Sequence, residues 1–225
     1  MDFFDAKQIG VKICGITSLS DAHMCIAAGA GALGFNFFPG SKRYLPPEPA
    51  LPWIKSLSTP AARVAVVVNP DESLIRLLRN SEAFDAIQFH GDESPAFCAA
   101  AGFARWIRAV RVSDLTSLQH ALAYDTPHLL LDAAVAGSYG GTGQRLDWNL
   151  ARDFVCTNNQ RRFILAGGLN AENVTQAVRI VRPSAVDVAG GVEASPGIKD
   201  EYLARHFVAA TQNGAVTNAK TQSGF

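Results

Sequence analysis

Residues 11–38, VKICGITSLSDAHMCIAAGAGALGFNFF, contain two apolar runs separated by an amphipathic stretch. The apolar runs, residues 11–16 and 33–38, are rich in β-branched and aromatic side chains and nearly continuous in hydrophobicity. That pattern is typical of strands covered on both faces. Between them, Ser20-Asp21 supplies a helix start signal and Gly29 a stop signal. The segment therefore predicts a strand–helix–strand unit of a parallel sheet.

The same alternation continues through the rest of the 225-residue chain. Six further apolar runs of strand type follow, at residues 63–68, 86–89, 105–110, 128–132, 162–166 and 185–188. Eight strand–helix units in one chain of this length predict an α/β protein, a single-domain (β/α)8 TIM barrel. The alternative is an open doubly wound sheet. It would need a GxGxxG turn after the first strand, and the sequence there is CGIT.

Composition and the chain ends narrow the classes of function. Lysine plus arginine and aspartate plus glutamate number 20 each, so no net charge attracts nucleic acid or an anionic membrane. No apolar run approaches the roughly 20 residues of a membrane span, and the N-terminus lacks a signal-peptide pattern. We therefore expect a cytoplasmic protein without nucleic-acid or membrane partners. The barrel should occupy residues 1–213, and the small, polar residues 214–225 predict a disordered tail.

The four cysteines, Cys14, Cys25, Cys98 and Cys156, include no CxxC pair and no metal-site spacing, so we expect no metal. Cysteine is often a small buried apolar residue, which suits the three that lie on helix-like segments. Cys14 differs because it ends the first strand and precedes Gly15, which lets a ligand approach closely. Its thiolate could remove a carbon-bound proton or attack an electrophile. Its position alone fits a buried structural thiol equally well.

Asp132 follows three leucines at the end of the predicted strand 128–132. Catalytic residues of TIM barrels lie at the C-terminal ends of the strands and in the loops that follow them. Partial burial raises the pKa of a carboxyl group, which favours a proton-donating role for Asp132 over that of a turn cap. The glycine-rich residues 137–143 come next. They predict a mobile lid, a backbone contact with an anion, or a plain flexible loop.

Two glycine pairs, Gly167-Gly168 and Gly190-Gly191, follow the seventh and eighth predicted strands. Barrels commonly bind phosphate at these two places through backbone N–H groups. A glycine lets the ligand come close to the backbone because it has no Cβ. The two pairs therefore predict a phosphorylated small molecule as the substrate.

Arg43 and Lys12 each leave two interpretations open. Arg43 could bind a carboxylate with its two-pronged guanidinium, or it could be a solvated loop charge. Lys12 lies two residues before Cys14 and hence on the same face of the strand. Inside a barrel it would form an ion pair, with Asp187 as the candidate partner, or it would form a Schiff base as in an aldolase. A third hypothesis is a barrel that binds phosphate without catalysis.

Ten motifs then appear in order along the chain. They are VKICGIT (residues 11–17), LGFNFFP (33–39), SKRY (41–44), QFHGDE (88–93), LLD (130–132), GGTG (140–143), AGGLN (166–170), VDV (186–188), GVE (191–193) and PGIKD (196–200). Together they resemble the phosphoribosylanthranilate isomerase family of tryptophan biosynthesis, and the resemblance covers about residues 11–205. One departure lies after Asp187, where family members often carry serines and this chain has VAGG (188–191).

The resemblance implies an isomerase of the aldose–ketose type that needs no cofactor. It would convert N-(5′-phosphoribosyl)anthranilate to 1-(2-carboxyphenylamino)-1-deoxyribulose 5-phosphate by an Amadori rearrangement. Cys14 would be the general base, Asp132 the general acid and Arg43 the residue that binds the anthranilate carboxylate. The further substrate-binding residues implied are Gln88, His90, Gly141, Gly167, Gly168, Asp187, Gly190 and Gly191. The choice between a monomer and a homodimer stays open.

Overall fold

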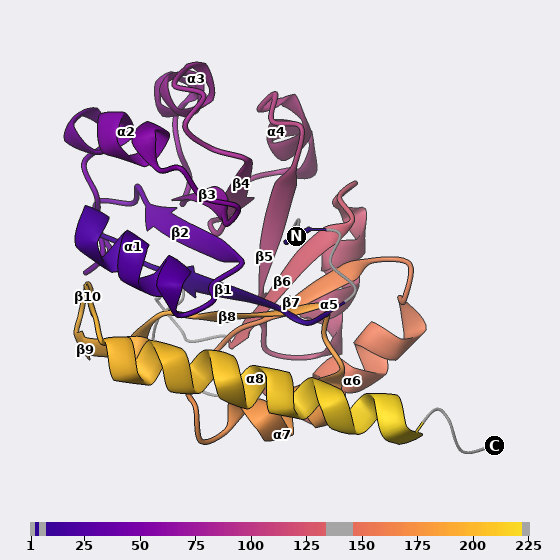
Figure 1. Cartoon of the computed structure of the whole chain (residues 1–225). Coiled ribbons are helices and arrows are strands. Elements are labelled where there is room, and N and C mark those ends of the chain that lie inside the picture. Colours follow the sequence, from indigo (N-terminus) through magenta and orange to yellow (C-terminus); the bar gives the residue numbers. More distant parts are fainter. Residues whose placement is uncertain (1–2, 5–7, 134–145, 222–225) are drawn as a thin grey trace.

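In the computed structural model, which describes residues 3–4, 8–133 and 146–221, eight parallel strands form a closed barrel (Figure 1). The strands are β1 (Gly10–Cys14), β2 (Ala32–Asn36), β3 (Ala62–Val67), β4 (Ala86–Phe89), β5 (Trp106–Val112), β6 (His128–Ala133), β7 (Arg162–Leu165) and β8 (Ala185–Val188). Each pairs with the next along the chain, and β1 pairs with β8 to close the ring. The predicted TIM barrel is confirmed, and all eight predicted runs overlap a strand.

Helices connect the strands and form the outer ring of the barrel (Figure 1). They are α1 (Leu19–Ala27), α2 (Pro47–Ser56), α3 (Glu72–Asn80), α4 (Pro95–Ala100), α5 (Leu115–His120), α6 (Trp148–Thr157), α7 (Val174–Val181) and α8 (Glu201–Thr221). Side-chain oxygens of Ser18, Asp71, Ser94, Asp114 and Asp147 accept backbone N–H bonds in the first turns of five of them. These caps explain why the helices begin where they do. No helix in the described ranges is long and apolar enough to span a membrane.

Three short elements follow β8, and none of them was predicted. The 3-10 helix η2 (Gly190–Val192) leads into an antiparallel hairpin of β9 (Glu193–Ser195) and β10 (Ile198–Lys199). A further 3-10 turn, η1 (Ala121–Ala123), follows α5. Strands of two or three residues are too short to show a hydrophobic period, so the sequence pattern does not reveal the hairpin.

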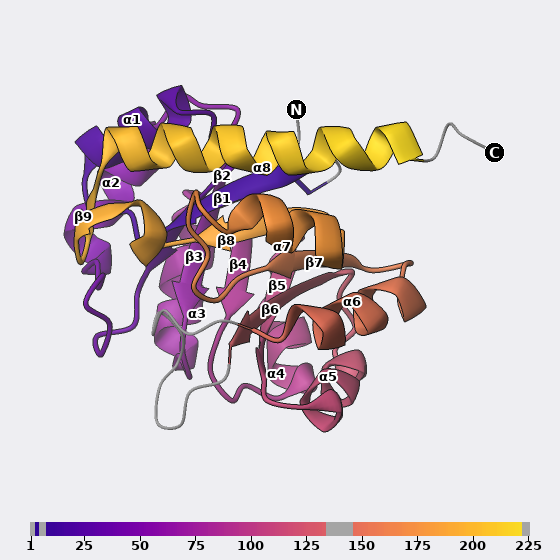
Figure 2. The ribbon, with the colours of Figure 1, turned by 90° about the horizontal axis from the view of Figure 1, so that it is seen from below.

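The C-terminal segment differs from its prediction as a disordered tail from residue 214. Helix α8 continues to Thr221 and lies along α7, as Figure 2 shows. Gly214 is buried, and a Cβ there would lie 2.8 Å from Cγ1 of Val178 and 3.2 Å from the carbonyl oxygen of Thr175. The small residue that suggested a tail therefore allows close contact between two helices. Residues 222–225 lie outside the described residues.

The N-terminal mouth of the barrel is filled by two aromatic side chains. Phe3 and Phe4 are 4% and 1% exposed and cluster with inward-facing residues at the strand starts, several of them alanines. The Phe4 ring meets His128 edge to face at a centroid distance of 4.9 Å, and the Arg105 guanidinium lies 5.2 Å from its centroid. Because the alanines leave space on the barrel axis, the phenylalanines close this end, opposite to the strand ends that carry the predicted site.

We expect Phe4→Ala to lower the free energy of unfolding by about 3–5 kcal/mol, because it leaves a cavity that the surrounding alanines cannot fill. Urea or guanidinium unfolding of the purified protein measures this change. The control is Leu115→Ala at a side chain that is 52% exposed, where we expect a change within about 0.5 kcal/mol. Equal losses in the two variants would show that Phe4 does not support the barrel.

Candidate active site

The C-terminal ends of β1, β2 and β8 bring together a thiol, an ammonium and a carboxylate. Lys12 Nζ donates to Asp187 Oδ1 at 2.7 Å, and the two residues are register partners of β1 and β8. Lys12 is fully buried in this ion pair, which is one of the two arrangements that the sequence left open. A Cβ added at Gly34 would lie 2.7 Å from Cys14 Sγ and 3.0 Å from Lys12 Nζ. The missing side chain at Gly34 therefore makes room for both groups.

The two groups influence each other's ionisation. Burial raises the pKa of the Cys14 thiol above its ordinary value, although the positive charges of Lys12 and Lys199 oppose this rise. Burial alone would lower the pKa of Lys12, but the negative charge of Asp187 and the neighbouring Cys14 outweigh it, so that pKa is raised. Lys12 is thus held as a cation beside Cys14. Once formed, the Cys14 thiolate is a stronger base than an ordinary thiolate.

A second group of polar side chains lies at the ends of β4 and β6. Asp132 is 6% exposed; its Oδ1 accepts the N–H of Ala133 at 2.9 Å, and its Oδ2 lies 3.4 Å from His90 Nε2. Gln88 Nε2 lies 3.1 Å from His90 Nδ1. Because the amide nitrogen donates, Nδ1 accepts, and the ring hydrogen is assigned to Nε2 on the side of Asp132. The Gln88 amide thereby orients the imidazole toward the carboxyl group.

The side chain of Arg43 packs against Gly15, the residue that follows Cys14 in the chain. Gly15 has φ +78°, and a Cβ there would collide with Cδ of Arg43, so both the turn and the packing require glycine. Arg43 Nε and Nη2 donate to Glu193 Oε1 and Oε2 at 2.8 and 2.7 Å. The hydrogen bonds and the charge of Glu193 raise the pKa of Arg43. Arg43 is therefore held in place and is not a solvated loop charge.

The two glycine loops lie against each other and against the groups above. A Cβ at Gly191 would overlap the carbonyl oxygen of Leu169, so the loop after β8 rests on the loop after β7. Gly167 has φ +86°, and a Cβ there would lie 3.1 Å from Asp132 Oδ1. A Cβ at Gly190 would lie 3.3 Å from Arg43 Nη2. These contacts link the predicted phosphate-binding loops to the carboxyl group and to the guanidinium.

The structure thus places the predicted site residues at one end of the barrel, with a single exception. Gly141 and the rest of the glycine-rich loop lie within residues 134–145, outside the described residues. Sequence reasoning missed Glu193 and Lys199 as site residues, because they lie in the hairpin β9–β10 and not at the end of a barrel strand. Their one signal is their occurrence in the GVE and PGIKD motifs.

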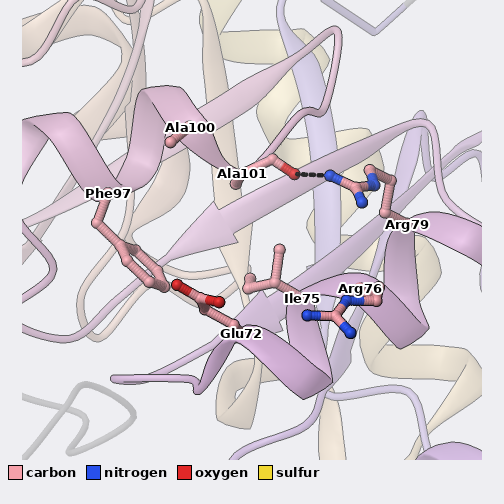
Figure 3. Close-up of a pocket in the computed structure, with 7 residues that line it drawn as sticks. All are labelled: Glu72, Ile75, Arg76, Arg79, Phe97, Ala100 and Ala101. Carbon is pink, nitrogen blue, oxygen red and sulfur yellow. Dashed lines mark hydrogen bonds between the residues drawn. The ribbon is translucent and has the colours of Figure 1, made fainter.

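Two surface cavities lie away from this end of the barrel. The larger, about 260 Å³, lies between α3 and α4 on the outer ring; its lining residues are Glu72, Ile75, Arg76, Arg79, Phe97, Ala100 and Ala101 (Figure 3). The second, about 180 Å³, lies near Phe3 and Gly10 at the N-terminal mouth. Neither is lined by a predicted site residue. Over the part of the chain that the structure describes, no three His, Cys, Asp or Glu side chains are grouped to hold a metal ion.

Comparison with known proteins points to one family. The model of the N-(5′-phosphoribosyl)anthranilate (PRA) isomerase family matches residues 11–210. A protein named N-(5′-phosphoribosyl)anthranilate isomerase from Citrifermentans bemidjiense is 44% identical over 206 residues, which cover 92% of this chain and 98% of that protein.

Solved structures that are similar to this chain belong to the same family. Phosphoribosyl anthranilate isomerase from Thermotoga maritima superposes with a TM-score of 0.82 at 38% identity, covering 91% of this chain and 99% of that one. A second structure holds reduced 1-(o-carboxyphenylamino)-1-deoxyribulose 5-phosphate; its TM-score is 0.79 at 37% identity, with 91% and 99% of the chains covered. A third, with the same TM-score, identity and coverage, is of monomers generated from the dimeric Thermotoga maritima protein.

Proposed function

The chain belongs to the N-(5′-phosphoribosyl)anthranilate isomerase family of tryptophan biosynthesis, and from this premise we propose that Cys14 and Asp132 transfer the protons of the isomerisation. The substrate is N-(5′-phosphoribosyl)anthranilate and the product 1-(2-carboxyphenylamino)-1-deoxyribulose 5-phosphate. One observation carries the assignment: a thiol, a carboxyl group, a fixed guanidinium and two glycine loops meet at one end of the barrel. These are the groups that a substrate with a phosphate and a carboxylate requires.

Asp132 acts first in the proposed mechanism, as the general acid. Its Oδ1 is occupied by the N–H of Ala133, which leaves Oδ2 to carry the proton. Transfer of this proton to the furanose ring oxygen breaks the bond from that oxygen to C1′ and leaves a protonated imine on the anthranilate nitrogen. His90 lies beside Oδ2, and Gln88 contacts the other ring nitrogen of His90 and so helps to hold this edge of the site in place.

Cys14 acts second, as the general base. The imine makes the proton on the adjacent carbon acidic, and the Cys14 thiolate removes it to give an enolamine. The enolamine tautomerises to the ketone, so substrate and product are isomers and no electrons are exchanged with a cofactor. The proton gained by Cys14 balances the one given by Asp132, and exchange with solvent restores both groups. Each acid–base step of this kind typically contributes about 10²–10⁴-fold.

The two anionic ends of the substrate have separate binding groups in this proposal. Arg43 binds the anthranilate carboxylate, and backbone N–H groups of Gly167, Gly168, Gly190 and Gly191 bind the phosphate. The structure of a relative with a reduced carboxyphenylamino ribulose phosphate supports this arrangement, because that ligand carries both anions. Backbone binding suits a chain whose residues directly after β8, Ala189 and Gly190, carry no hydroxyl group. Gln88, His90, Gly141 and Asp187 stay predicted substrate contacts.

A direct assay tests the proposal. The fluorescence of freshly formed N-(5′-phosphoribosyl)anthranilate should disappear at an enzyme-dependent rate when the purified protein is added. A well-folded sample without turnover would overturn the assignment. Circular dichroism of the same sample establishes that it is folded.

The Schiff-base alternative at Lys12 is disfavoured by the ion pair. A Schiff base requires a neutral amine, whereas Lys12 is buried against Asp187 and its pKa is raised. Borohydride reduction in the presence of substrate tests this alternative, and a covalent adduct on Lys12 would support the lyase over the isomerase. A barrel that only binds phosphate would show neither turnover nor an adduct.

Two further features stay proposals. A family of amino-acid biosynthesis fits the predicted cytoplasmic location. The dimeric relative from Thermotoga maritima supports a homodimer, and sedimentation velocity of the purified protein decides between monomer and dimer.

A further inference from the structure

We propose that Glu193 is a positioning residue: with Lys199 it fixes the Arg43 guanidinium beside Cys14 and so determines where the carboxylate of the substrate binds. The inference rests on the proposed role of Arg43 in binding that carboxylate. It assigns a function to the hairpin β9–β10, which lies outside the ring of barrel strands.

The contact between Glu193 and Arg43 uses one edge of the guanidinium. Nε and Nη2 donate to the two carboxylate oxygens, and the side chains are 4% and 14% exposed. A guanidinium has five N–H donors, and this contact takes one from Nε and one from Nη2. The edge formed by Nη1 and Nη2 therefore keeps its donors, in the geometry that grips a second carboxylate with two hydrogen bonds. Glu193 fixes the direction of that edge.

Lys199 connects Glu193 to the strand that carries Cys14. Its Nζ donates to Glu193 Oε1 at 2.7 Å, to the carbonyl oxygen of Cys14 at 2.6 Å and to that of Ala189 at 3.3 Å. The three bonds use the three N–H groups of the ammonium, whose side chain is fully buried. The ends of β1 and β8 are thus tied to the same carboxylate that holds Arg43. The distance from the guanidinium to Cys14 is set by this connection.

The hairpin is itself anchored to neighbouring elements. The backbone N–H of Lys199 donates to Asp21 Oδ2 at 3.1 Å on α1, and Thr17 Oγ1 donates to the carbonyl oxygen of Gly197 at 2.5 Å. Glu193 and Lys199 therefore project from a hairpin that is held at its turn and at β10. A loosely held segment could not fix Arg43 in one direction.

The charges of the cluster suit an anionic ligand. Burial alone would raise the pKa of Glu193, but hydrogen bonds and charges from Arg43 and Lys199 outweigh it, so the pKa lies below its ordinary value. Glu193 is therefore ionised at neutral pH. The cations Arg43 and Lys199 then flank the anion Glu193, so these three side chains carry a net charge of +1 that attracts the carboxylate of the substrate. Glu193 holds Arg43 without cancelling the attraction.

A purely structural salt bridge would predict something different from a positioning role. Loss of a salt bridge that only stabilises the fold should change the affinity for every ligand by a similar factor, through stability or through the shape of the whole site. A lost positioning contact affects the ligands that carry the carboxylate and spares those that lack it. The test therefore compares two ligands that differ in this one group.

The variant is Glu193→Gln, which keeps the size of the side chain and removes its charge. The ligands are reduced 1-(2-carboxyphenylamino)-1-deoxyribulose 5-phosphate and the same compound without the carboxyl group, titrated calorimetrically. We expect the Kd of the carboxylate ligand to rise by about tenfold or more, because an Arg43 that is no longer held in direction loses its bidentate contact with the ligand carboxylate. The Kd of the other ligand should change by less than about twofold. In the assay, KM should rise more than kcat falls.

Two further variants serve as references. Glu201→Gln removes the charge of an exposed residue that pairs with Arg205, and it should leave both Kd values unchanged. Glu193→Asp keeps the charge but is one methylene shorter, so it too should weaken the carboxylate ligand selectively if distance matters. It also replaces Glu193→Gln if that variant does not fold. Wild-type selectivity in a folded Glu193 variant would overturn the positioning role.

Arg43→Ala separates this inference from the proposed function. If Arg43→Ala weakens both ligands equally, Arg43 does not bind the carboxylate and the proposed function of that residue fails. If Arg43→Ala weakens the carboxylate ligand alone while the Glu193 variants bind as wild type does, the inference about Glu193 fails by itself. Selective weakening in both supports both.

Discussion

Asp132→Asn is expected to lower kcat/KM for N-(5′-phosphoribosyl)anthranilate by about 10²–10⁴-fold, the usual contribution of a general acid. Asparagine keeps the volume of the side chain and an oxygen that accepts the N–H of Ala133, so the end of β6 should stay in place. It cannot transfer a proton as a carboxylic acid does. Because the loss concerns a proton transfer, it should appear in kcat, with KM little changed.

The control for this prediction is Asp153→Asn. Asp153 is an exposed carboxylate on α6 that pairs with Arg152, and its replacement should change kcat/KM by less than about twofold. A loss smaller than tenfold in Asp132→Asn would place the acid elsewhere. His90 would then be the next candidate, because its Nε2 lies 3.4 Å from Asp132 Oδ2 and faces the same space.

Asp132 also illustrates what the sequence predicts well. A carboxyl residue directly after three leucines is unusual for a surface, and the TIM barrel places every strand end on the same side. Local composition and one topological rule were therefore enough to bring Cys14 and Asp132 to one end, whereas the binding role of His90 came from the family resemblance. The same reasoning placed the glycine pairs after β7 and β8. Each of these predictions needs contacts only within a strand and its loop.

The parts that escaped prediction depend on contacts between distant segments. Arg43 and Glu193 are 150 residues apart, and nothing near either residue indicates that they pair. Phe3 and Phe4 fill the barrel because inward positions on several strands are alanine, which no local pattern shows. The small, polar residues from Gly214 onward suggested a tail, yet the missing side chain of Gly214 allows α8 to pack closely against α7. In each case the structural role of a residue depends on a partner that is distant in the sequence.

The Cys14 prediction has a matched control within the chain. We expect Cys14→Ser to lower kcat/KM by about 10²–10⁴-fold, because a serine hydroxyl is far less acidic than a thiol and does not form an anion to act as the base. Cys25→Ser should leave the kcat/KM of the folded protein nearly unchanged. Cys25 is buried on α1, and burial raises its pKa to about 12, so its thiol is not ionised at neutral pH. Equal losses in the two variants would assign the base to another residue.

The pH dependence of kcat/KM provides the sharper test of Cys14. A base must be deprotonated to act and the acid Asp132 must be protonated, so the profile is measured in Asp132→Asn, where the acid no longer titrates. There the residual activity should rise with pH and be lost as the pH falls below the pKa of the thiol. Burial raises that pKa, which places the rise on the alkaline side of the titration of an ordinary cysteine, while Lys12 and Lys199 restrain the shift. In the double variant Cys14→Ser/Asp132→Asn the residual activity should no longer show this rise. A residual rate that keeps the same alkaline rise would mean that another group titrates, and Cys14 would then be a structural thiol that borders the site.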